Sequence, residues 1–218
     1  PGILHVDNPD LYRGAFGDSV QGYVDCVDRT LATASCGSVA GIFIEPVQGF
    51  NGVVPMPDGY MRQVADSVRG AGGLLIVDEV QTGFGRLGNS FWGFEQYDVV
   101  PDIVILGKPM GNGYPIGAVV CTDEIADAFN NGMEFFSSFG GNPVSCAIGQ
   151  AVLNVIEDEQ LQQNAKMVGD YYLQELRKLQ QKYECIGDVR GSGLFIGFEF
   201  VKDRRTLEPD TELAQKVK

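Results

Sequence analysis

Short apolar runs alternate with amphipathic segments along most of the chain. Four of these runs are bounded by turn residues and are typical of buried strands. The strands are predicted at residues 38–45, 73–79, 100–108 and 116–122. A helix is predicted between the first two, at residues 59–73, with an apolar face made of Met61, Val64, Ala65 and Val68. This alternation predicts an α/β fold with a mostly parallel central sheet flanked by helices.

The C-terminal part of the chain has a different pattern. A helix is predicted to start after Asn142, a residue type that favours helix N-caps. A longer amphipathic helix at 159–183 and an alternating strand at 189–201 follow it. We therefore assign residues 1–155 to part of a large domain and residues 156–218 to part of a smaller α+β domain.

Both ends of the chain indicate an internal piece of a larger protein. The sequence begins at Pro1 rather than at a methionine. It ends inside DTELAQKVK, an amphipathic helical pattern with Asp210 or Thr211 as its cap and without a stop signal.

Charge and composition restrict the classes of function. The chain has 218 residues, a formal net charge of -13 and a pI of about 4.4, so nucleic acid and anionic membrane surfaces would repel it. Its five cysteines include no C-x-x-C pair and it has one histidine, from which we expect no metal site. The sequence has no run long enough to cross a bilayer and does not open on a signal-peptide pattern, which predicts a cytoplasmic protein.

Three successive predicted strands end on charged residues: Glu45, then Asp78 and Glu79, then Lys108. Ligands of α/β proteins bind outside the carboxyl ends of parallel strands, so these side chains predict a site. A salt bridge is the simpler explanation for any single one of them, whereas the whole set, with glycine-rich loops after each strand, favours a functional site. Asp78 and Glu79 are neighbours on an extended strand and must point to opposite faces.

A lysine and an aspartate at neighbouring strand ends are the two residue types that bind the reactive groups of pyridoxal phosphate. Its aldehyde forms a Schiff base with a lysine, and its pyridine nitrogen needs an aspartate to hold the proton that makes the ring an electron sink. Lys108 and Asp78 are the candidates for these two roles.

Five blocks that include these residues occur in order along the chain: IEPVQGFNGVVP, LLIVDEVQTGFGRLG, PDIVILGKPMGNGYPIGAVV, SSFGGNPVSCA and VRGSGLFIGFE. They resemble the signature blocks of the class III pyridoxal-phosphate-dependent aminotransferases, which have fold type I. The resemblance covers nearly the whole chain. It implies an enzyme, a transferase with pyridoxal 5'-phosphate as its cofactor.

The resemblance also implies roles for individual residues. It gives Lys108 the Schiff base, Asp78 the pyridine nitrogen, Gln81 a place near the ring hydroxyl and Val80 a place on the ring face. Ser138 stands where the family usually has a threonine that reaches the cofactor phosphate of the neighbouring subunit. The implied assembly is a homodimer with shared active sites.

Glu45 matches a glutamate that in many members of the family pairs with a substrate-binding arginine. We expect that arginine beyond Lys218, and we expect the small-residue loop that cradles the cofactor phosphate before Pro1. The piece alone is therefore expected to be inactive. The whole protein is expected to act on an amine or amino acid together with a keto acid or aldehyde.

The sequence also bears on alternatives to amino transfer. Three sequence segments are most similar to those of the family branch that contains phospho-lyases acting on phosphoethanolamine and phosphohydroxylysine: GKPMGNGYP, GGNPVSCAIG and PDLYRG. We predict amino transfer, with phosphate elimination and a catalytically silent scaffold as the alternatives. A P-loop is excluded because the lysine of GKPMGNG precedes the glycines and no Ser or Thr follows it. A Ser-His-Asp hydrolase is disfavoured because the one histidine, His5, is at the N-terminal end of the chain and RGSGLFIG does not match G-x-S-x-G.

Overall fold

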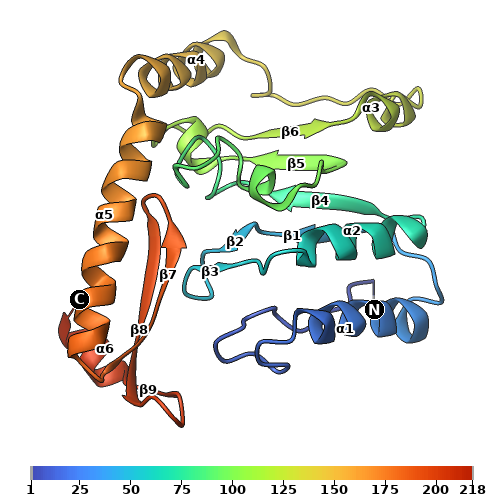
Figure 1. Cartoon of the computed structure of the whole chain (residues 1–218). Helices are drawn as coiled ribbons and strands as arrows, with labels where there is room; N and C mark the ends of the chain where they lie inside the picture. The colour runs from blue at the N-terminus through green and yellow to red at the C-terminus, as the bar shows by residue number, and fades with distance from the viewer. Residues whose placement is uncertain (1, 218) are drawn as a thin grey trace.

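The computed structural model describes residues 2–217, and its largest sheet has four strands in the order β1-β4-β5-β6 (Figure 1). The strands are β1 (Gly41–Ile44), β4 (Leu74–Asp78), β5 (Ile103–Leu106) and β6 (Ala118–Cys121). Strands β1, β4 and β5 run parallel, whereas β6 runs antiparallel to β5. The prediction of an α/β fold with a mostly parallel sheet is therefore confirmed.

Helix α2 (Tyr60–Gly70) covers one face of this sheet. Its Met61, Val64 and Val68 are buried, and they belong to the same apolar cluster as the fully buried Leu75 of β4. The predicted helix and its apolar face are both confirmed. Each of these burials contributes roughly 1.5–3 kcal/mol relative to an exposed side chain.

Helix α1 (Val20–Ala34), which packs beside α2, is not predicted by the sequence pattern (Figure 1). Its first turn is capped by Ser19, whose hydroxyl accepts a hydrogen bond from the Gly22 amide at 3.1 Å. Glycine, valine and threonine are weak helix formers, which hides the helical pattern in the sequence. Buried Tyr23 and Val27 attach α1 to the core, so tertiary packing stabilises a helix that propensity alone does not favour.

A second, smaller sheet follows helix α5 and packs against it (Figure 1). These elements are α5 (Leu161–Lys182), β7 (Ile186–Ser192), β8 (Phe195–Asp203) and β9 (Glu208–Pro209). The prediction of a single strand at 189–201 is wrong, because this run forms two antiparallel strands of a hairpin. Gly191 and Gly193 have φ angles of 121° and 54°, which glycine adopts without strain, and they allow the chain to reverse.

Three further helices complete the chain: α3 (Asp123–Phe129), α4 (Pro143–Asp158) and α6 (Thr211–Val217). The side chain of Asn142 accepts from the Ser145 amide, and that of Asp210 accepts from the Leu213 amide, both at 2.9 Å, so these two predicted caps are confirmed. The boundary expected between residues 155 and 156 falls inside α4, and the division into two domains stays a prediction.

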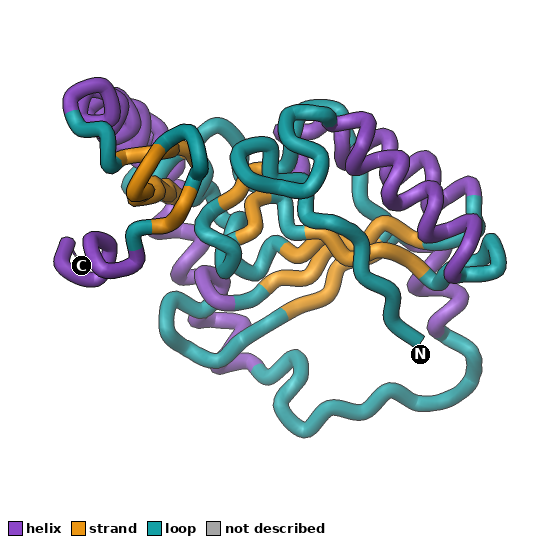
Figure 2. Tube along the Cα trace, turned by 90° about the horizontal axis from the view of Figure 1, so that it is seen from below, coloured by secondary structure: helices purple, strands orange, loops and turns teal. Residues whose placement is uncertain are grey.

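Four short elements position the loops around the main sheet. They are β2 (Val47–Gln48), β3 (Val54–Pro55) and the 3-10 helices η1 (Gly93–Tyr97) and η2 (Lys108–Met110). By contrast, the loop of residues 130–142 between α3 and α4 extends away from the strands (Figure 2). Among the helices within residues 2–217, none combines the length and the apolar character needed to cross a membrane.

Candidate active site

The carboxyl ends of β1, β4 and β5 meet at one edge of the main sheet, because these three strands are parallel. Ile44 pairs with Val77, so Glu45 and Asp78 follow at the same level of the edge. Lys108 comes two residues after the end of β5, in the first position of η2. The structure thus brings the three predicted charged strand ends to one edge.

Lys108 lies beside Gln81 at this edge. Its side chain is exposed, and Nζ is 3.4 Å from Gln81 Oε1, which accepts a hydrogen bond from it. The backbone of Lys108 has a φ of 29°, a left-handed conformation that is uncommon for a residue with a side chain and is found often at functional sites. Lys108 is therefore the residue at which the chain turns away from the sheet after β5.

Asp78 and Val80 lie together at the end of β4. The Val80 amide donates to Asp78 Oδ1 at 2.8 Å, which fixes the orientation of the carboxylate. This bond leaves Oδ2 for a second donor. Val80 also adjoins the backbone of Gly107, the residue before Lys108, so the ends of β4 and β5 are in contact through an apolar side chain.

Glu79 points away from Asp78, as the alternation of an extended strand requires. It is fully buried, and its carboxylate accepts from the Thr82 hydroxyl at 2.6 Å and from the Phe94 amide at 2.8 Å. Burial raises the pKa of Glu79, although the bonds from Thr82 and from the Gly93 and Phe94 amides partly offset this effect. Glu79 therefore ties the loop after β4 to the core rather than facing the candidate site.

The pH dependence of stability tests this placement of Glu79. A carboxyl whose pKa is higher in the folded state stabilises the fold fully below its unfolded pKa, and this contribution is lost as the pH rises through the folded-state pKa. The glutamine of the Glu79→Gln variant does not titrate. We therefore expect the free energy of unfolding of the wild type to fall relative to that of the variant as the pH rises above about 4.3. Urea unfolding of both proteins across a pH series measures the difference, and a difference that is independent of pH would contradict the burial argument.

Gly49 connects Glu45 to Gln81. Its amide donates to Glu45 Oε2 at 3.1 Å, and a Cβ added at Gly49 would lie only 2.5 Å from Gln81 Oε1. A side chain at this position would force the Gln81 amide to shift. Gly49 is not among the predicted site residues, although its place in the VQGFNG loop after the strand that ends on Glu45 is a usable signal.

Ser138 is in the exposed loop of residues 130–142. Within the described residues 2–217, no hydrogen bond joins it to Lys108, Asp78 or Gln81. Its loop also presents exposed aromatic side chains, which are Phe135, Phe136 and Phe139.

The side chains at the strand edge fit the functional groups of pyridoxal phosphate. Lys108 supplies an exposed amine for the aldehyde, and Asp78 retains an oxygen for a ring nitrogen. Val80 supplies an apolar surface, and Gln81 supplies an amide that can bond a hydroxyl. The four residues follow or end two neighbouring parallel strands, β4 and β5, at the same edge of the sheet.

The chain is similar to proteins of two named activities. It is 50% identical over 223 residues to the human protein named alanine–glyoxylate aminotransferase 2, mitochondrial, covering 92% of this chain and 43% of that protein. It is 47% identical over 233 residues to a Caenorhabditis elegans protein named ethanolamine-phosphate phospho-lyase homolog 1, covering 98% of this chain and 50% of that protein. The chain therefore spans about half the length of these relatives.

One solved structure shows the same fold with the same partial coverage. It is a thermostable (S)-enantioselective omega-transaminase from Thermomicrobium roseum, with a TM-score of 0.88 and 39% identity. The match covers 98% of this chain and 49% of the transaminase. The predicted fold of the pyridoxal-phosphate-dependent transaminases is therefore confirmed.

The prediction of a cytoplasmic protein is wrong in the light of these relatives. The human relative is named as mitochondrial, and so is an Arabidopsis thaliana relative. Cellular location is set by targeting signals, which composition and the lack of an apolar span do not report.

A family model decides the affiliation. The model described as aminotransferase class-III matches residues 1–218, and this family depends on pyridoxal phosphate. The match includes every block on which the sequence resemblance rests, from the strand ending on Glu45 to the hairpin near the C-terminus. The chain belongs to the class III aminotransferase family.

Proposed function

We propose that the protein containing this chain is a pyridoxal-phosphate-dependent transaminase, which moves an amino group between an amine or amino acid and a keto acid or aldehyde. The observation that carries the proposal is the meeting of Lys108, Gln81 and Asp78 at one strand edge, in a chain that matches the family over residues 1–218. Bound pyridoxal phosphate supplies an electron-withdrawing ring that stabilises negative charge on the substrate carbon next to nitrogen.

Lys108 and Asp78 have the central roles in this proposal. Lys108 would hold the aldehyde carbon of the cofactor through Nζ, and the same atom would move the proton of the substrate carbon. Asp78 would keep a proton on the ring nitrogen by accepting a charge-assisted hydrogen bond from that nitrogen. The bond from the Val80 amide orients this carboxylate in advance.

The remaining candidates position the cofactor and the substrate. Val80 packs on the ring face, Gln81 binds the ring hydroxyl, and Glu45 faces the substrate side. The bond from the Gly49 amide to Glu45 and the close packing of Gly49 on Gln81 support a shared orientation of these two side chains.

We include a homodimer with shared active sites in the proposal. Ser138 would reach the cofactor phosphate of the neighbouring subunit from the loop of residues 130–142. The exposed side chains of Phe135, Phe136 and Phe139 in this loop, which are 77%, 84% and 85% exposed, support a partner surface there.

A phospho-lyase is the second candidate function. The relative from C. elegans named as an ethanolamine-phosphate phospho-lyase homolog favours it, at 47% identity. In both reactions Lys108 would hold the cofactor and would remove a proton from the substrate carbon next to nitrogen. They differ afterwards, because elimination expels a phosphate from the next carbon, whereas transamination needs an amino acceptor.

A direct assay separates the two reactions. The intact protein, supplied with cofactor and phosphoethanolamine but no keto acid, is expected to release no inorganic phosphate over many turnovers. With an amino donor and a keto acid or aldehyde, it is expected to form a new amine. Sustained phosphate release without an acceptor would replace transamination by elimination. A protein that binds no cofactor at all would be a catalytically silent scaffold.

A further inference from the structure

The hairpin of β7 and β8 carries an ionic cluster outside the candidate active site. Arg190 of β7 bonds to Asp188 at 2.6 Å and to Glu199 of β8 at 2.7 Å. Arg13, from the N-terminal segment, forms an ion pair with the same Glu199. The side chain of Arg190 is only 11% exposed, so its two carboxylate partners compensate the loss of hydration.

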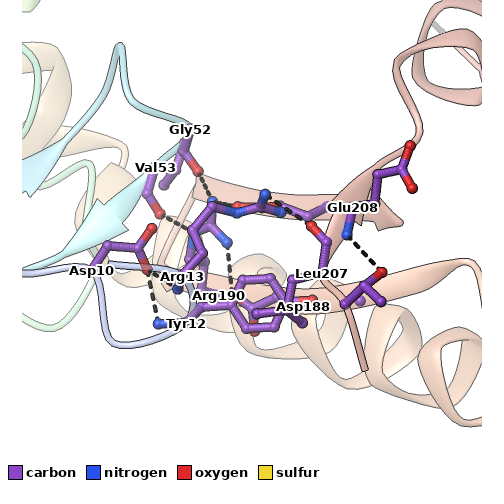
Figure 3. Close-up of polar contacts among 12 residues, drawn as sticks. Asp10, Tyr12, Arg13, Gly52, Val53, Asp188, Arg190, Leu207 and Glu208 are labelled. Carbon is purple, nitrogen blue, oxygen red and sulfur yellow. Dashed lines mark hydrogen bonds and ion pairs between the residues drawn. The ribbon is translucent and has the colours of Figure 1, made fainter. Parts of the chain in front are cut away.

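Arg190 also reaches across to the loop of residues 49–53, which joins β2 to β3. Its Nε donates to the Val53 carbonyl at 2.9 Å, and its Nη2 donates to the Gly52 carbonyl at 2.7 Å (Figure 3). The planar guanidinium can make these bonds and both ion pairs at once, which the single ammonium of a lysine cannot. Arg190 therefore fixes this loop against the smaller sheet.

The loop held by Arg190 begins at Gly49, which packs on Gln81 of the candidate site. The Gly52 and Val53 amides donate to the Gly49 carbonyl at 3.2 and 3.3 Å, which closes the loop on itself. Gly49 in turn packs on Gln81, whose Oε1 lies 3.4 Å from Lys108 Nζ. A displacement of the loop would therefore move the surface against which Gln81 rests.

The same hairpin also holds the segment that follows Gln81. The Ser192 hydroxyl donates to the Leu87 carbonyl at 2.7 Å, and the Leu194 amide donates to the Arg86 carbonyl at 3.1 Å. The hairpin thus holds two separate segments, the loop of residues 49–53 and residues 86–87 after Gln81. This second set of contacts does not involve Arg190.

We propose that Arg190 is a positioning residue of the cofactor site, which acts by holding the loop of residues 49–53 so that Gly49 supports Gln81 beside Lys108. This inference rests on the proposed function, because it concerns the geometry of the same site. Arg190 touches neither cofactor nor substrate in this scheme. Its effect passes through Gly49 and Gln81.

The test compares cofactor binding by variants of the intact protein. Arg190→Lys removes the fork that holds Gly52 and Val53 but keeps the charge. Gly49→Ala presses a Cβ against the Gln81 amide and against the Phe195 ring, and it replaces no residue of the ionic cluster. Arg204→Lys is the matched control, because Arg204 also donates to backbone carbonyls in the smaller sheet region, those of Gln180, Tyr183 and Glu184, but contacts no loop of the site.

Both test variants are expected to raise the dissociation constant of pyridoxal phosphate by about 10-fold to 100-fold, the range seen when the residues that orient a ligating side chain are removed in metal sites. They should also shift the pH titration of the absorbance band of the lysine-bound cofactor, while Arg204→Lys leaves both quantities unchanged. Equal effects of Arg190→Lys and Arg204→Lys, or no effect of Arg190→Lys and Gly49→Ala, would overturn the inference. A wild-type protein without the absorbance band would instead overturn the proposed function itself.

Discussion

Replacing Lys108 by alanine is expected to lower the turnover of the intact protein by about 10⁴-fold or more, which is about 5.5 kcal/mol of transition-state stabilisation. The amine of Lys108 is exposed at the strand edge and is the group proposed both to hold the cofactor and to move the substrate proton. Both functions are lost together in Lys108→Ala. Steady-state rates with a saturating amino donor and acceptor measure the effect.

The matched control for this variant is Lys178→Ala. Lys178 is an exposed lysine of α5 that pairs with Glu175 on the helix surface, at 2.6 Å. We expect its removal to leave the rate unchanged, because the pair is on a helix that contributes no candidate site residue. Comparable rates for Lys108→Ala and the wild type would remove Lys108 from the mechanism.

Changing Asp78 to asparagine is expected to preserve the fold and some cofactor binding. It is expected to raise the activation free energy by about 2–4 kcal/mol, the effect of losing other electrostatic partners in active sites. Asparagine can still accept the Val80 amide, so the local backbone is retained. It carries no charge, however, and holds a proton on the ring nitrogen less well. Rates and cofactor absorbance of the variant measure the two effects separately.

Glu79→Gln is the control for Asp78→Asn, since it alters the adjacent carboxylate on the opposite face of the strand. Glu79 is buried against Thr82 and Phe94, so its replacement should change stability more than catalysis. If Asp78→Asn turns over nearly as fast as the wild type, or if Glu79→Gln is the slower of the two, the proposed role of Asp78 is wrong.

The charged residues at the strand edge could be predicted from the sequence because each one follows its own apolar run. Apolar runs that end on Glu45, Asp78 and Lys108 are visible as a pattern, and parallel strands bring such ends to one edge. The roles of Gln81, Val80 and Ser138 came from the family resemblance, and their assignment stays a prediction. The structure adds the contact between Lys108 and Gln81, which links the segments that follow β5 and β4.

Other features depend on contacts between distant parts of the chain, which a single sequence does not display. Helix α1 is stabilised by packing on α2, and its own residues give a weak helical signal. The run predicted as one strand at 189–201 becomes a hairpin because its glycines permit a reversal that alternation alone does not reveal. The bonds from Arg190 to Gly52 and Val53 join residues far apart in the sequence.

Chemical trapping of the cofactor tests the central claim most directly. Borohydride reduction of the intact protein with bound pyridoxal phosphate converts the bond between cofactor and lysine into a stable one, and peptide mass mapping then locates the pyridoxyl group. We predict that the label is on Lys108, at the end of the VPDIVILGK segment. A label on Lys166 or Lys178, or no label on any lysine despite bound cofactor, would contradict the assignment.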